Sequence, residues 1–161
     1  MPRAASRPLP RRSCQTLDPM NTGLAWFVSS VFVLLAGWHF CMALLPSAGI
    51  NGAVPSVSGK PLFVPSARAT MLVGVVLLLF ACLVAATAGL VELGIPARVL
   101  SWLCYALAVS LLARAVGEFK YVGFFKRVRG SKFAKLDTLL YSPVCLLLAV
   151  GVAVIAQRHG I

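Results

Sequence analysis

Four long apolar stretches constrain the fold of this 161-residue chain more than any other feature of its sequence. The first, 24–45, has 22 residues and no formal charge, and the others lie at 69–91, 96–116 and 138–157. A bilayer core about 30 Å thick requires about 20 helical residues, each contributing a rise of about 1.5 Å. We therefore predict an all-α polytopic membrane protein, in which residues 20–161 form a four-helix transmembrane bundle.

The composition supports lipid, rather than water, as the main solvent of the chain. Only 12% of the residues are charged and 60% are hydrophobic, whereas a soluble domain has about 25% charged residues. The formal net charge of +11 is compatible with nucleic-acid binding. However, the basic residues lie at the ends of apolar stretches instead of covering a hydrophilic domain, so we expect no nucleic-acid partner.

The N-terminal residues 1–19 differ from the rest of the chain because they are rich in Arg and Pro and lack apolar periodicity. This composition predicts a disordered tail. Met20 offers an alternative start of translation, in which case residues 1–19 would belong to an over-extended reading frame.

Charge is dense only in residues 114–137, which we call the basic segment. It contains seven basic residues and only two acids, Glu118 and Asp137, with aromatic residues between them. Such a mixture suits the headgroup layer of a bilayer, where rings are buried and basic groups face anionic lipid. The residues expected to contact lipid headgroups are Lys120, Lys126, Arg127, Arg129, Lys132 and Lys135.

The distribution of basic residues also predicts an orientation in the plasma membrane. Four spans place both termini on one face and the loops 46–68 and 114–137 on the other. The two loops hold nine basic residues, against six on the opposite face, or two if the chain starts at Met20. By the positive-inside rule, we expect both loops in the cytoplasm and both termini outside.

Five polar residues lie in or near the predicted spans on the face of the two loops, and we consider them a candidate polar pocket: His39, Arg114, Glu118, Asp137 and Tyr141. In this pocket Arg114 would hold an anionic group, while His39 with Glu118 or Asp137 would move protons. Each residue also has a simpler interpretation. His39 would be an interfacial side chain, Arg114 would extend to lipid phosphate, and Asp137 would cap the N-terminus of the fourth helix.

Two further features affect these interpretations. Pro143 lies inside the fourth apolar stretch, and a helix starting there would be too short to cross, so we expect a helix kinked at Pro143. The sequence has no nucleophile–base motif and no metal-ligand spacing, and none of the five cysteines forms a CxxC pair. We therefore predict no metal and no cofactor, and we expect the cysteines to serve in packing.

Three segments carry a resemblance to a known family: AGWHFCMAL, GKPLFVPSARATM and RAVGEFKYVGFFKRVRGSKFAKLDTLLYSPVCLLL. They resemble the small bacterial integral-membrane family called domain of unknown function 3995, and the similarity covers approximately residues 24–156. The resemblance implies a four-helix membrane protein with no assigned activity. It also places the following residues at the family's typical positions: His39, Arg114, Gly117, Phe125, Asp137, Tyr141 and Pro143.

These observations predict a small, non-enzymatic integral membrane protein whose basic aromatic loop contacts anionic lipids in the cytoplasm, with homo-oligomerisation left open. The alternative is a membrane-embedded enzyme, or a protein that binds a small ligand or lipid, with its polar pocket at the cytoplasmic rim. A small transporter is a weaker hypothesis, because no ionisable group lies near the middle of a predicted span.

Overall fold

The computed structural model describes residues 19–45, 56–57, 60–61, 65–117, 123 and 132–159, and shows an all-α fold apart from one minimal hairpin. The elements are α1 (Pro19–Leu44), β1 (Ser56–Val57), β2 (Lys60–Pro61), α3 (Ala67–Thr87), α4 (Ala97–Val116), α5 (Lys132–Leu136), the π-helical turn η2 (Asp137–Tyr141) and α6 (Ser142–His159). In the described residues, four helices are long and apolar enough to cross a membrane. The predicted four-helix membrane architecture is thereby confirmed, whereas residues 1–18 of the predicted tail lie outside the described residues.

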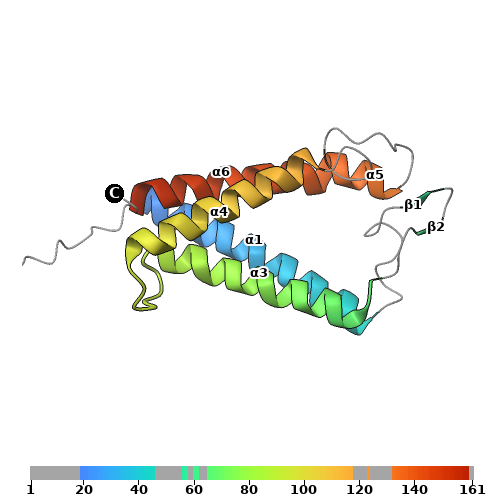
Figure 1. The fold of residues 1–161 in the computed structure, drawn as a ribbon, viewed down its shortest axis with the longest axis horizontal. Coiled ribbons are helices and arrows are strands. Elements are labelled where there is room, and N and C mark those ends of the chain that lie inside the picture. Colours follow the sequence, from blue (N-terminus) through green and yellow to red (C-terminus); the bar gives the residue numbers. More distant parts are fainter. Residues whose placement is uncertain are drawn as a thin grey trace, which may run out of the picture.

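The bundle consists of two antiparallel helix pairs, α1 with α3 and α4 with α6 (Figure 1). The pairs approach each other near residues 88–96, which connect α3 to α4, and diverge toward α5 (Figure 1). One end of the bundle is formed by residues 88–96, the start of α1 and the end of α6, and we call it the turn rim. The opposite end, where α1 and α4 stop and α3 and α5 begin, is the loop rim.

The common core of the four helices lies toward the turn rim. Its buried side chains come from residues 25–32 of α1, 81–84 of α3, 104–108 of α4 and 148–156 of α6, together with Ala88, which follows α3. Phe32 and Phe80 meet edge to face with their ring centroids 5.9 Å apart, and Val28 packs so closely on Gly151 that a Cβ there would collide with it. At the loop rim, contacts are made within the pairs instead: the ring of Phe40 occupies the space beside Gly74.

The second span ends earlier than predicted because a glycine cap terminates it. We expected this span at 69–91, but α3 stops at Thr87. Gly89 has a φ of 74°, its N–H donates to Ala86 O, and the N–H of Leu90 donates to Ala85 O. This pair of hydrogen bonds is the Schellman pattern, in which a left-handed glycine closes the helix.

The fourth span begins earlier than predicted, so the interpretation of Asp137 as its N-cap is wrong. The helical segment starts at Lys132 and continues without a break to His159, and Asp137 lies inside it. The distortion expected near Pro143 takes the form of the π turn η2, where the N–H of Ser142 donates to Asp137 O five residues earlier. A proline lacks the N–H for a helical bond and collides with the carbonyl four residues before it, and the wider turn relieves both problems.

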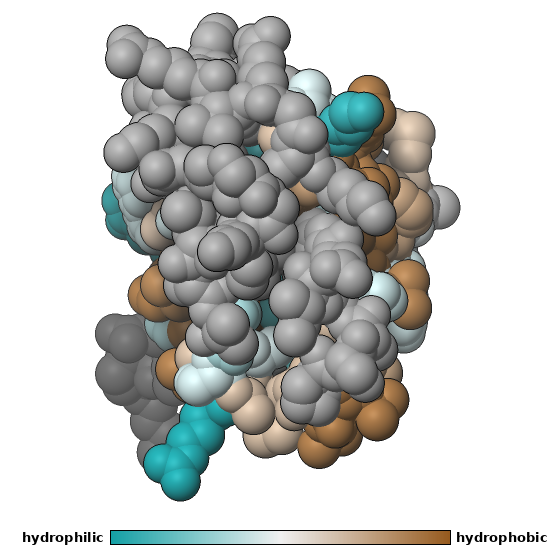
Figure 2. Space-filling view, turned by 90° about the vertical axis from the view of Figure 1, so that its right-hand side faces the viewer, coloured by the Kyte–Doolittle hydropathy of each residue, from teal (hydrophilic) through white to brown (hydrophobic). Residues whose placement is uncertain are grey.

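The outer surface of the bundle is apolar, as a hydrocarbon environment requires. Large exposed side chains occur on every long helix, for example Trp26 on α1, Leu79 on α3, Trp102 on α4 and Leu147 on α6, each more than 60% exposed. Viewed onto the loop rim, hydrophobic residues line the flank of the molecule (Figure 2).

Candidate functional site

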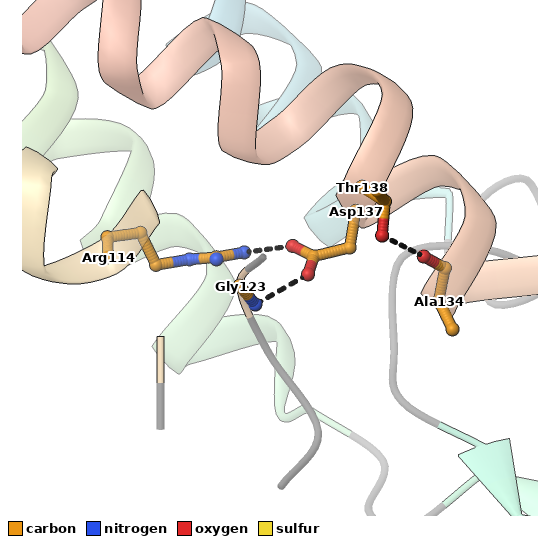
Figure 3. Close-up of polar contacts among 5 residues, drawn as sticks. All are labelled: Arg114, Gly123, Ala134, Asp137 and Thr138. Carbon is orange, nitrogen blue, oxygen red and sulfur yellow. Dashed lines mark hydrogen bonds and ion pairs between the residues drawn. The ribbon is translucent and has the colours of Figure 1, made fainter. Parts of the chain in front are cut away.

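Asp137 and Arg114 form a partly buried ion pair where α4 ends and the fourth helix begins (Figure 3). Asp137 is completely buried, whereas the Arg114 side chain is 38% exposed. One carboxylate oxygen, Oδ1, accepts a hydrogen bond from Arg114 Nη2 at 3.0 Å, and Oδ2 accepts one from the backbone N–H of Gly123 at 2.7 Å. Both oxygens are therefore satisfied, as a buried carboxylate requires.

Two glycines bring the chain back to this carboxylate. Gly117, with a φ of 83°, follows the last turn of α4, and its N–H donates to Ala113 O. Gly123 has a φ of 93°, and a Cβ at this position would collide with the backbone of Val116 and Gly117. Only glycine fits a left-handed backbone packed so tightly on a helix end. This fit allows the Gly123 N–H to reach Asp137, so that one carboxylate connects α4, the returning chain and the fourth helix.

Tyr141 is the last residue of the π turn and lies near this ion pair. Its hydroxyl is within electrostatic range of Asp137 and Arg114, and its ring is tilted against Phe133, with centroids 6.1 Å apart. Three of the five predicted pocket residues are therefore gathered at one place: Arg114, Asp137 and Tyr141.

Of the two remaining pocket residues, only His39 is described by the structure, and it does not join this group. His39 Nδ1 lies 2.8 Å from the carbonyl of Leu35 in its own helix. His39 belongs to the α1–α3 pair, which diverges from the α4–α6 pair at the loop rim (Figure 1). Glu118 lies outside the described residues.

Among the described residues, two buried polar atoms have no hydrogen-bond partner here: Arg114 Nη1 and the hydroxyl oxygen of Ser142, the residue after Tyr141. Ser142 was not predicted from the sequence. Several other hydroxyls in these helices donate to the carbonyl four residues earlier, as Thr87 does to Leu83 O and Ser110 does to Ala106 O. The corresponding carbonyl for Ser142 lies within the π turn, which changes the spacing. The only sequence signal would have been the position of Ser142 directly before Pro143.

The predicted headgroup-contact residues are only partly described. Lys135 is exposed on α5, and Lys132 is the first residue of that helix. The others, Lys120, Lys126, Arg127 and Arg129, lie outside the described residues.

The described residues offer no cluster of three or more His, Cys, Asp or Glu side chains that could hold a metal ion. Four of the cysteines are free thiols in the described chain, and Cys104 lies 3.2 Å from the hydroxyl of Thr87 in the core. The site therefore consists of a guanidinium whose charge is neutralised by a carboxylate. One of its nitrogens, Arg114 Nη1, has no hydrogen-bond partner among the described residues.

Comparison with known proteins agrees with the sequence resemblance. Searches of curated proteins and of solved structures found no match. A family model described as "Protein of unknown function (DUF3995)" matches residues 32–152, which include the second half of α1, all of α3 and α4, most of α6 and the whole candidate site. The chain therefore belongs to the DUF3995 family.

Proposed function

We propose that this protein is a non-enzymatic membrane protein whose loop rim binds anionic lipid headgroups. The observation that carries the proposal is the complete burial of Asp137 against Arg114, because it keeps this carboxylate away from lipid headgroups. The pair does not change the net charge of the basic segment, which is +5 over residues 114–137 (seven minus two) and also +5 over residues 115–136, without the pair (six minus one). A basic group near an anionic membrane surface contributes about 1 kcal/mol to binding.

We also propose that the loop rim faces the cytoplasm of the plasma membrane. The loops 46–68 and 114–137 connect helices that end and begin at this rim, so they belong to one side of the bundle. Their nine basic residues exceed those of the opposite side, and cytoplasmic loops are enriched in Lys and Arg.

A second candidate function is the binding of a small polar ligand at the same rim. The two unpartnered buried atoms, Arg114 Nη1 and Ser142 Oγ, favour it, because such atoms in a membrane helix are costly and mark functional sites. Catalysis is not part of the proposal, since no nucleophile paired with a base lies in the described site.

Native mass spectrometry of the full chain in a nonionic detergent tests the primary proposal. The protein is titrated with dioleoyl-phosphatidylglycerol, which is anionic, or with the zwitterionic dioleoyl-phosphatidylcholine. The double variant Lys126→Gln/Arg127→Gln should lose about 2 kcal/mol of phosphatidylglycerol binding, approximately 30-fold, and little phosphatidylcholine binding. The matched control, Arg98→Gln/Arg158→Gln, removes two basic residues near the turn rim and should bind as the wild type does.

Two results would contradict the proposal. In the first, both double variants lose the same amount of phosphatidylglycerol binding, which would indicate a response to total charge instead of a site at the loop rim. In the second, wild-type binding is insensitive to salt between 50 and 500 mM, since contacts with exposed basic residues are screened over this range.

A further inference from the structure

The turn rim contains a hollow of about 260 Å³ between the end of α3 and the start of α4. Gly89 and Gly94, with φ values of 74° and 68°, turn the connecting chain twice around it. We call this feature the turn hollow. Its volume lies just below the range of about 300–1,000 Å³ that is usual for small-molecule sites, so it suits one chemical group better than a whole lipid.

The buried side chains that line the turn hollow include one hydroxyl, which already has a hydrogen-bond partner. Thr87 and Leu100 line it and are each about 95% buried. The Thr87 hydroxyl donates to Leu83 O at 2.8 Å and lies 3.2 Å from the thiol of Cys104. Recognition of a polar ligand therefore depends on groups nearer the mouth.

The charged side chain that lines the turn hollow is an acid. Among the described residues, Glu92 is the only charged one in the lining, and it is exposed. The carboxyl end of α3 and the amino end of α4 both border the hollow, so their opposite partial charges offset each other. Glu92 therefore favours a cation over an anion.

The walls beside Glu92 are apolar, which indicates an amphiphile as the ligand and not a freely soluble amine. Val91, Leu93 and Ile95 line the hollow and are each more than 40% exposed. At the end of a membrane-spanning bundle, such side chains lie where lipid headgroups meet the hydrocarbon. They would pack against the glycerol and upper acyl region of a lipid whose headgroup enters the hollow.

Arg98 provides a complementary charge beside the turn hollow. It follows the lining residue Ala97 in the first turn of α4 and is exposed. In the part of the chain that the structure describes, neither Glu92 nor Arg98 takes part in an ion pair. Glu92 and Arg98 are six residues apart in sequence. An acid and a base that form no ion pair among the described residues match a headgroup that carries an ammonium and a phosphate.

We infer that the turn hollow binds the ammonium group of an ethanolamine-type phospholipid, with Glu92 as its counter-ion and Arg98 beside the phosphate. This site is separate from the anionic-lipid site proposed at the loop rim, and each can exist without the other. Exposed charge pairs contribute at most about 1 kcal/mol, so Glu92 is expected to account for a two- to fivefold change in binding.

The test is a titration of the purified full chain with dioleoyl-phosphatidylethanolamine, followed by native mass spectrometry in a nonionic detergent. Glu92→Gln should weaken binding two- to fivefold, because the shape of the side chain is kept and its charge is lost. Glu118→Gln makes the same chemical change in the basic segment and should leave binding unchanged. Ala97→Leu should weaken binding as well, because the larger side chain enters the hollow without altering any charge.

Three outcomes would overturn the inference. Glu92→Gln could bind as the wild type does, or Glu92→Gln and Glu118→Gln could weaken binding equally, which would indicate a general charge effect. Alternatively, free ethanolamine could compete fully with the lipid at the same concentration, which would identify a soluble amine as the ligand. None of these measurements uses phosphatidylglycerol, so failure here leaves the proposal for the loop rim untouched, and the reverse also holds.

Discussion

Arg114→Met is expected to destabilise the protein much more than Asp137→Asn, although the two residues share one ion pair. The reason is their unequal burial: Asp137 is completely buried, and Arg114 is 38% exposed. Without Arg114, a carboxylate is left in the protein interior without the guanidinium that balances its charge, although it still accepts a hydrogen bond from the Gly123 N–H. Without the negative charge of Asp137, the guanidinium can still reach water or a lipid headgroup.

The structure sets the scale of this difference. At 3.0 Å and an effective dielectric constant of about 20, the attraction between the two charges is about 5–6 kcal/mol before their loss of hydration is subtracted. Removing one partner of a buried pair costs about 3–5 kcal/mol, which we expect for Arg114→Met. Asp137→Asn keeps an oxygen that can accept from Gly123 and loses one charge-assisted hydrogen bond, so about 1.5–3 kcal/mol is expected.

The assay is reversible unfolding of the full chain in mixed micelles by titration with sodium dodecyl sulfate. The double variant Arg114→Met/Asp137→Asn should be more stable than the sum of the single changes predicts, with a coupling free energy of about 2 kcal/mol or more. Arg114→Lys, which keeps the charge, should recover part of the stability. Equal losses of stability for the two single variants, or a coupling free energy near zero, would refute this reasoning. Either result would show that the cost does not come from leaving the buried Asp137 carboxylate without Arg114.

Three other predictions concern packing, the unpartnered hydroxyls and orientation. Gly123→Ala should lower stability by about 1–3 kcal/mol, because its backbone is left-handed and lies against the end of α4; an unchanged thermal midpoint would contradict that packing. Ser142→Ala and the matched Ser101→Ala each remove a buried hydroxyl without a partner, so both should leave the midpoint unchanged or raise it; a ligand-induced shift lost only in Ser142→Ala would favour the second candidate function. In a chain whose five native cysteines are replaced by alanine, an impermeant maleimide should label Glu92→Cys on intact cells and Lys135→Cys only after permeabilisation, and the reverse pattern would invert the proposed orientation.

The helices were predictable because a hydrocarbon environment imposes a simple rule on the sequence. Each span must be apolar and long enough, and its backbone must satisfy its own hydrogen bonds. Counting residues from the ends of these spans also placed Arg114 and Asp137 at the same rim, where they form the ion pair. Depth in a bilayer is thus accessible from sequence, because the helical rise is constant.

The side-chain partners were less predictable because they depend on the path of the chain between helices. Asp137 follows a short helix instead of a loop, and it accepts a hydrogen bond from Gly123, which is 14 residues away. Local sequence favours Asp137 as a helix cap, since Asp often caps a helix, and only the tertiary approach of Gly123 provides the alternative partner. In the same way, the sequence indicated that Pro143 disturbs the helix but did not indicate a π turn, because a kink also relieves the clash.

The placement of the acidic residues bears on how the rims could recognise different lipids. An exposed acid beside the basic segment would reduce its attraction for anionic headgroups, whereas Asp137 is buried and its charge is balanced by Arg114 at 3.0 Å. The same carboxylate accepts a hydrogen bond from the Gly123 N–H. Asp137 therefore attaches the basic segment to the bundle at Gly123, although its own charge does not reach the protein surface. Glu92 is exposed at the opposite end and forms no ion pair with any residue that the structure describes. The two proposals therefore differ in the burial of an acid. In these proposals, the loop rim attracts phosphate because Asp137 is buried, and the turn rim attracts an ammonium because Glu92 is exposed.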